Sequence, residues 1–124
     1  MKIASVVLAL ICVPMSHAQD GDALDEIRAE MARLREENAR IRGELDRMIG
    51  QALSDGWSID RLARIELAVL RCGAHELNSM QHIPARAVVS EYAALSDACG
   101  CEVGFVNAVL DGLARGARLV EMES

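Results

Sequence analysis

Aromatic residues and proline are scarce in this sequence. Trp57, Tyr92 and Phe105 are its only aromatic side chains, and Pro14 and Pro84 are its only prolines. The apolar fraction is nevertheless 52%, so it rests on Ala, Leu, Val and Ile. Runs of alternating apolar and polar residues, which indicate strands, are also missing. The composition therefore predicts an all-α fold, and 124 residues suffice for one domain or for one small domain with an appendage.

An excess of positive charge is missing too, since the formal net charge is −6. Residues 19–53 carry six Arg against nine Asp and Glu, and residues 54–124 carry six Arg against ten. Neither half has the bulk charge of a basic nucleic-acid-binding module. Any contact to RNA must therefore come from a local patch.

The residue sets that carry catalysis are not visible. We find no paired carboxylates at a plausible pocket, no Ser/His/Asp set, no Gly-rich phosphate loop and no cluster at metal-ligand spacing. Cys99-Gly100-Cys101 lacks the further ligands that a zinc site needs. We interpret Cys72, Cys99 and Cys101 as small, partly buried thiols. The sequence thus predicts no enzyme, no catalytic residue, no metal and no cofactor.

Residues 1–18 have the pattern of a secretory signal. Lys2 gives a short positive start, and residues 3–13 form an uninterrupted apolar run that ends at Pro14. Small residues at Ser16 and Ala18 fit a cleavage point after them. The run is too short to span a membrane as a helix. The alternative to a signal is a buried N-terminal helix.

Residues 22–53 predict a long helix with a coiled-coil pattern. Glu occupies the g positions and Arg the e positions, so that Glu30 can reach Arg35 of a parallel partner. Two Asn38 side chains can pair across such a seam, which fits a homodimer. The alternative is an amphipathic helix that packs on its own domain. The seam residues, which include the dimer candidates Leu34, Asn38 and Ile41, follow strict 3,4 spacing over residues 24–48: Leu24, Ile27, Met31, Leu34, Asn38, Ile41, Leu45 and Met48.

Residues 54–119 predict a bundle of three helices, followed by a tail at residues 120–124. The first helix begins at Ser58, a good N-cap, the second begins at Pro84, and the third covers residues 104–119. Their apolar faces are Ile59, Leu62, Ile65, Val69, Leu70 and Leu77 on the first, Val88, Val89, Tyr92, Leu95 and Cys99 on the second, and Phe105, Val106, Val109, Leu110 and Leu113 on the third.

Polar residues and one glycine of the first helix suggest specific roles. Gly73 lies within the apolar face, where a missing side chain allows another helix to approach closely. Glu66 and Glu76 project into or beside that face, and buried carboxylates need partners. The opposite face carries the only basic stripe of this half, whose residues are candidates for contacts to RNA phosphates, with solvated surface as the alternative: Arg61, Arg64, Arg71 and His75.

Three ordered segments of this half resemble a known family. They are WSIDRLARIELAVLRCGAHEL, IPARAVVSEYAALSDACG and GFVNAVLDGLAR. In order and spacing they are similar to the C-terminal half of the bacterial transcription antitermination factor NusB family, over residues 54–118. The most specific matches are Phe105-Val106-Asn107 followed by Val109-Leu110-Asp111, and Ile83-Pro84 followed by Glu91.

The resemblance implies an all-helical, cytoplasmic factor that binds the boxA RNA of ribosomal transcripts and pairs with a small-subunit ribosomal protein. It also implies that the region of Glu66 and Phe105 contributes to binding the protein partner and the RNA, and we take these two residues as the candidates for partner binding. For Asn107 and Asp111 we expect a structural role, in which they cap or bond neighbouring loops so that the last helix docks. Gly73 and Glu76 belong to the same structural set.

The N-terminal half departs from the family. In the family, this half begins with an Arg-rich helix that contributes much of the RNA binding. Here the signal-like leader and the coiled-coil pattern stand in its place. Ser90 stands where the family usually has Asn, and His75 where it often has an aromatic residue. We therefore keep a second hypothesis, in which the chain is an exported, dimeric coiled-coil adaptor of the cell envelope, located in the periplasm, with a helical docking domain.

Overall fold

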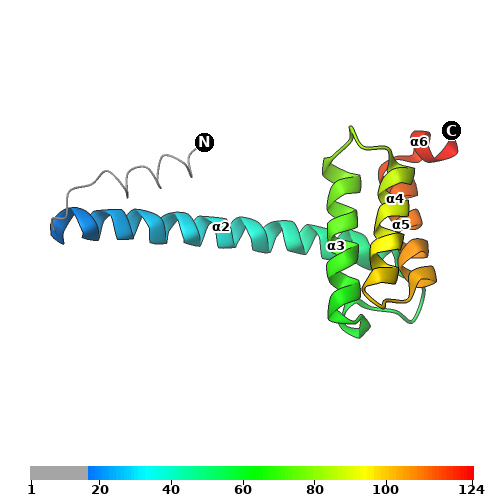
Figure 1. Ribbon diagram of the computed structural model, residues 1–124, viewed down its shortest axis with the longest axis horizontal. Coiled ribbons are helices and arrows are strands. Elements are labelled where there is room, and N and C mark those ends of the chain that lie inside the picture. The colour runs from blue at the N-terminus through cyan, green and yellow to red at the C-terminus, as the bar shows by residue number, and fades with distance from the viewer. Residues whose placement is uncertain (1–16) are drawn as a thin grey trace. The chain divides into compact units, whose positions relative to one another are not determined.

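A computed structural model describes residues 17–124, and all regular structure in this part of the chain is helical. This confirms the all-α fold. The leader predicted at residues 1–18 falls almost wholly outside the described residues. The helices are α2 (His17–Ala52), a short 3₁₀ turn η1 (Ile59–Arg61), α3 (Arg64–Ser79), α4 (Ala85–Ala98), α5 (Val103–Ala117) and α6 (Leu119–Glu123) (Figure 1).

The chain divides into two compact units between Arg40 and Ile41. In the first, residues 20–40 of α2 leave most of their side chains exposed. Leu24, Met31 and Leu34 are 49%, 46% and 39% exposed, and Asn38 donates from its side chain to the Leu34 carbonyl oxygen at 3.1 Å. This segment is rich in good helix formers, and i,i+3 ion pairs on its surface add a little support.

The second unit, residues 41–124, contains the last turns of α2 and the bundle. Leu45 and Ile49 are 8% and 0% exposed in its core, and Ile41 and Met48 pack against that core. These positions were predicted to continue a dimer seam. That prediction is wrong for the last heptad, because the chain's own helices cover Leu45 and contact Ile41. The uncovered part of the seam is limited to Leu24–Asn38.

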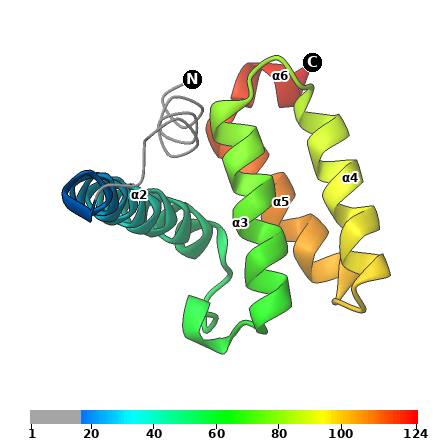
Figure 2. The ribbon, with the colours of Figure 1, turned by 60° about the vertical axis from the view of Figure 1, so that its left-hand side comes forward.

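Helices α3, α4 and α5 run alternately up, down and up, and α5 crosses the other two (Figure 2). Their contact surfaces supply the fully buried side chains Leu70, Leu77, Val88, Val106 and Leu110. The closest approach is at Gly73, where an added Cβ would lie 2.6 Å from Leu110 Cδ2. The last long helix therefore lies against the one that carries Gly73.

The start of α3 differs from the sequence prediction. Ser58 stands at the N-cap position of η1 without a side-chain capping hydrogen bond, and the chain then becomes extended at Leu62 and Ala63 before α3 begins at Arg64. Glu66 accepts a hydrogen bond from the Ala63 amide at 3.3 Å and so satisfies one free donor at this end. The extended step places Leu62 in the core, which a helix running on from Ser58 does not require.

Several side chains assigned to apolar faces or to buried thiols are exposed instead. Ile65 and Leu95 are 48% and 45% exposed, and Cys72 and Cys99 are exposed free thiols. Ser96 takes a buried position on α4 and donates to the Ala93 carbonyl oxygen. The apolar faces predicted for these helices were wider than the faces that other helices cover, and a helix buries only the residues that another element covers.

Arg118, between α5 and α6, is 5% exposed and holds one end of the bundle together. Its guanidinium donates to carbonyl oxygens at the C-terminal end of α3, and this arrangement also suits the negative end of the α3 dipole. It donates further to the α3–α4 loop and lies near a carboxylate of α6. The acceptors are Glu76, Leu77, Met80 and Ile83 through their carbonyl oxygens, and Glu121 through Oε2.

Glu121 of α6 in turn accepts a hydrogen bond from the Ala85 amide at 2.5 Å, at the start of α4. Arg86 donates to the Met122 carbonyl oxygen at 3.3 Å. The short last helix is therefore fixed to α4 at both Glu121 and Met122. Among residues 17–124, no helix is both long enough and apolar enough to cross a membrane.

Candidate functional site: a surface at the start of α3 and α5

An aromatic and cationic cluster lies on the surface before α3. Trp57 is 47% exposed, and its ring centroid lies 5.3 Å from that of Phe105 at an interplanar angle of 41°. The Arg61 guanidinium carbon lies 5.2 Å from the Trp57 ring centroid. Arg61 also donates to the Gly56 carbonyl oxygen, which fixes the guanidinium over the ring. Two of the three aromatic side chains of the chain thus meet at one surface position.

Glu66 lies near the same end of the bundle as this cluster. Burial raises the pKa of the Cys101 thiol, and the Cys99 thiol and the Glu66 carboxylate raise it further. Cys101 lies two residues before α5 begins, and Glu66 lies in the first turn of α3, so the starts of α3 and α5 are neighbours. The two residues expected to bind the protein partner, Glu66 and Phe105, therefore come from adjacent helix starts.

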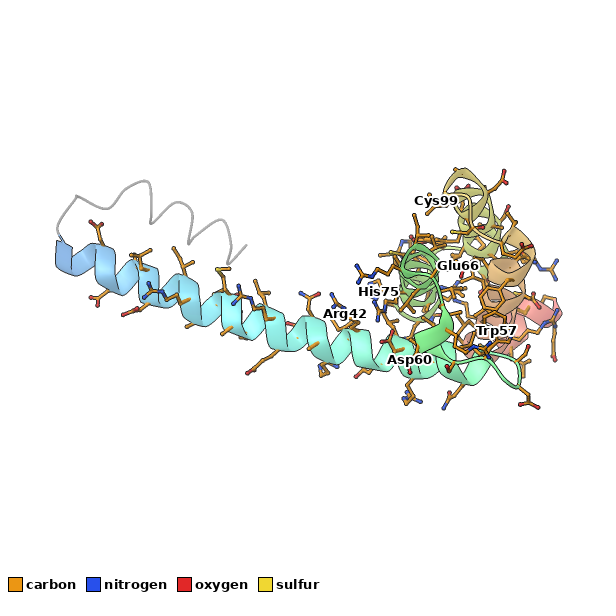
Figure 3. All side chains as sticks on the ribbon, turned by 90° about the horizontal axis from the view of Figure 1, so that it is seen from below. Arg42, Trp57, Asp60, Glu66, His75 and Cys99 are labelled. Atoms are coloured by element: carbon orange, nitrogen blue, oxygen red, sulfur yellow. The ribbon has the colours of Figure 1, made fainter. Side chains whose placement is uncertain are left out.

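The predicted basic stripe is only partly available to a ligand. Arg64, Arg71 and His75 share one side of α3, but Arg61 belongs to η1 and stacks on Trp57. Figure 3, which views α3 end-on, shows His75 and Glu66 on different sides of that helix. On α3, the stripe residues Arg64, Arg71 and His75 therefore lie on a different face from Glu66.

Arg71 is held by a carboxylate of the same unit. Its Nε and Nη2 atoms donate to the two Asp46 carboxylate oxygens at 2.7 and 2.8 Å. This hydrogen bonding raises the pKa of Arg71. A bidentate pair of this kind fixes α2 to α3, and it offsets the charge that was predicted to face RNA. Arg64 is the exposed Arg of the stripe that starts α3.

Glu76 has a structural contact. Its Oε1 accepts a 2.6 Å hydrogen bond from the Tyr92 hydroxyl, which joins α3 to α4 beside Gly73. Burial and this hydrogen bond raise the pKa of Tyr92. Since a half-buried carboxylate needs a donor, the pair explains how the α3–α4 contact accommodates Glu76.

Asn107 and Asp111 line an open groove of about 450 Å³ between α4 and α5, together with Arg86, Ser90 and Arg115. Asp111 accepts a 2.8 Å hydrogen bond from Arg115 on its own helix, and this bond raises the pKa of Arg115. The expectation that Asp111 bonds a neighbouring loop is wrong, because the guanidinium one turn away takes its carboxylate. Asn107 is exposed, and the described residues give its side chain no hydrogen-bond partner.

Three features of residues 41–124 were missed from the sequence. Trp57 is apolar and solitary in a turn, and only its pairing with Phe105 reveals a surface cluster. Asp46 was given no role from the sequence, whereas it pairs with Arg71. Arg118 gave one usable signal, since a basic residue after a helix can bond free carbonyl groups. No group of three or more His, Cys, Asp or Glu side chains in residues 17–124 could hold a metal ion.

Comparisons with known proteins match the chain to one family. The model of the NusB family matches residues 9–115, which begins earlier than the resemblance seen in the motifs. The transcription antitermination protein NusB of Rhodopseudomonas palustris (strain BisB18) is 46% identical over 84 residues, covering 66% of this chain and 50% of that protein. The NusB protein of Nitrobacter hamburgensis is 48% identical over 84 residues, and that of Rhodospirillum rubrum 47% over 76 residues.

The alignments cover 66% and 60% of this chain, and 52% and 41% of those two relatives respectively. The chain thus spans about half the length of the curated relatives that it matches. No solved structure matches the chain. With the family match extending over residues 9–115, and with an all-helical structure, the chain belongs to the NusB family.

Proposed function

We propose that the chain is a non-enzymatic transcription antitermination factor that binds a boxA-like RNA together with a small-subunit ribosomal protein. The observation that carries this proposal is the family match over residues 9–115. The relatives of Rhodopseudomonas palustris and Nitrobacter hamburgensis are named transcription antitermination proteins. The RNA and the ribosomal protein come from the resemblance of the motifs. A cytoplasmic location follows as part of the same proposal, since transcripts are made there.

The surfaces described above are compatible with two ligands. By helical period, Arg64 and His75 lie on one side of α3, and Glu66 and Phe105 lie at the neighbouring starts of α3 and α5. An RNA and a protein can therefore contact the bundle without competing for the same side chains. On this side of α3, Arg71 is paired with Asp46, which leaves Arg64 and His75 for RNA. So few cations predict weak RNA binding with a shallow salt dependence, because few phosphates are neutralised.

The test is a binding titration of the full chain with a labelled boxA-like RNA at several salt concentrations, with and without purified small-subunit ribosomal proteins. We expect binding at low salt that weakens as salt rises and strengthens when the ribosomal partner is present. Arg64→Gln should weaken RNA binding. The matched control is Arg115→Gln, since Arg115 lies on α5 and is paired with Asp111.

The proposal is wrong if the chain binds no boxA-like RNA at low salt, either alone or with any ribosomal protein. An equal loss in Arg64→Gln and Arg115→Gln would instead assign RNA binding to overall charge rather than to the face of α3. An RNA of scrambled sequence separates these outcomes further, because only binding through bases depends on sequence.

A further inference from the structure

The side chains of Trp57, Arg61 and Phe105 form a preordered cluster at the surface. Its rings are in contact, and its guanidinium is fixed both by the Trp57 ring and by the Gly56 carbonyl oxygen. Ordering these side chains costs little on binding, because the contacts already restrict them. Trp and Arg are also the residue types that contribute most often to the energetic centre of protein interfaces.

The exposure of Trp57 is unusual for a chain with so few aromatic residues. The chain has one Trp, one Tyr and one Phe, and a core built from Ala, Leu, Val and Ile leaves no aromatic side chain fully buried. Trp57, the largest apolar side chain, nevertheless keeps almost half of its surface in water. Covering it with a partner removes that apolar area from water, which favours association.

The geometry distinguishes between two kinds of partner. Unpaired RNA bases bind to proteins by stacking on a free aromatic face. Here the Arg61 guanidinium lies over the Trp57 ring, and Phe105 contacts the same ring at a tilt. A stacking base would have to displace Arg61 from the ring and from Gly56. The arrangement instead suits insertion of the whole cluster into a pocket.

The charge of the cluster specifies the chemistry of that pocket. Arg61 has five N–H donors, and among the described residues its one hydrogen bond goes to the Gly56 carbonyl oxygen. The remaining donors form a fork that fits a carboxylate. A pocket with apolar walls and an Asp or Glu at its rim complements both the exposed Trp57 ring and the Arg61 guanidinium.

We propose that the Trp57–Arg61–Phe105 cluster is the anchor by which this chain binds its protein partner, and that the partner receives it in an apolar pocket with an acidic rim. The inference rests on the proposed function, since it takes a small-subunit ribosomal protein as that partner. It assigns Arg61, which the sequence placed among the RNA-binding candidates, to the protein interface. It also adds Trp57 to the expected partner residues Glu66 and Phe105.

The sole Trp makes the test direct, because all tryptophan fluorescence of the full chain comes from Trp57. Individually purified small-subunit ribosomal proteins are titrated into the chain, and a boxA-like RNA is titrated separately. We expect one ribosomal protein to shift the Trp57 emission to shorter wavelength with saturation. The RNA alone should leave the emission wavelength unchanged.

Variants measure the size of the contribution by calorimetry against the same ribosomal protein. Trp57→Ala should weaken binding by about 30-fold or more, and Arg61→Gln by about 10-fold, as expected for residues at the centre of an interface. Leu95→Ala is the matched control, since Leu95 on α4 is exposed to nearly the same extent as Trp57. It should change the affinity by less than about 3-fold, as is usual for residues that lie outside an interface or at its edge.

Other outcomes overturn the inference. If the ribosomal protein binds but neither the Trp57 emission nor the Trp57→Ala affinity changes, the anchor lies elsewhere while the proposed function stands. If RNA alone shifts the emission, the cluster is a base-stacking platform. If the emission shifts with the concentration of the chain itself, the partner is a second copy. If neither ribosomal protein nor RNA binds, the proposed function and this inference fail together. The fluorescence titration uses the wild-type protein, so its result does not depend on whether a variant folds.

Discussion

The two units of the chain use the same spacing of apolar residues with opposite results. In residues 17–40, Leu24, Met31 and Leu34 follow 3,4 spacing and remain between 39% and 49% exposed. In residues 41–124 the same series continues through Leu45, which is 8% exposed, and the neighbouring Ile49 is fully buried. A 3,4 pattern therefore identifies an amphipathic helix, but it does not identify what covers the apolar side.

The polar contacts of the two units differ in whether they are local or join distant parts of the chain. The ion pairs of residues 17–40, Arg28–Asp25 and Arg33–Glu30, are local and largely exposed. The bundle instead joins distant parts of the chain, through Arg71 to Asp46, Tyr92 to Glu76, and Arg118 to the α3 carbonyl oxygens. Exposed local pairs contribute little to stability, whereas losing one member of a buried contact is costly.

The largest effect is expected at Arg118. Arg118→Met should destabilise the bundle by about 3–5 kcal/mol, because it leaves several buried carbonyl groups without a donor. Arg115→Met is the control, since its pair with Asp111 is exposed, and it should cost no more than about 0.5 kcal/mol. Urea unfolding followed by circular dichroism measures both. Equal midpoints for the two variants would contradict the role assigned to Arg118.

The comparison of the two units is tested most directly with two leucines of α2. Leu45→Ala should cost about 2–4 kcal/mol, since it opens a cavity in the core. Leu34→Ala should cost less than about 1 kcal/mol in the monomer, because Leu34 is already 39% exposed. The measurement is denaturant unfolding at low protein concentration. A large loss at Leu34 that grows with protein concentration would show that a second chain covers residues 24–38.

A smaller effect is expected where α3 and α5 meet. Gly73→Ala should cost about 1–3 kcal/mol, because the new Cβ would overlap the fully buried Leu110 side chain. Gly116→Ala on α5 is the matched control, since nothing lies within 4 Å of its added Cβ. It should stabilise the protein by up to about 1 kcal/mol through helix propensity. Thermal unfolding distinguishes the opposite signs.

The smallest effect concerns alkaline pH. The pKa of Tyr92 is raised in the folded state, so the folded protein keeps a proton that the unfolded chain releases near pH 10. The stability contributed by Tyr92 is therefore complete below about pH 10 and falls as the pH rises through the folded-state pKa. Tyr92→Phe should unfold more easily at pH 7 and show a shallower decline above pH 10. Parallel pH profiles for both proteins would rule out this contribution.

Much of the helical layout could be predicted from sequence, because capping residues and periodicity are local signals. The signals failed where local and tertiary preferences disagreed. Ser58 is a good N-cap, yet α3 begins at Arg64, since Leu62 reaches the core through an extended step. Leu95 fits an apolar arc but lies outside the contact surface. The partner candidates Glu66 and Phe105 are brought to neighbouring helix starts. Trp57, which we propose as the anchor beside them, belongs to no periodic pattern that would indicate a surface cluster.

The sequence by itself determined that the chain is helical, where most helices lie, and to which family it belongs, since these properties depend on composition, spacing and motif order. Only the tertiary structure decided which apolar residues are buried, that Asp46 neutralises Arg71, and that Arg118 bonds the end of α3. The reason is physical: a helix forms from contacts within a few residues, whereas burial and long-range hydrogen bonds depend on which distant segment occupies the adjacent space.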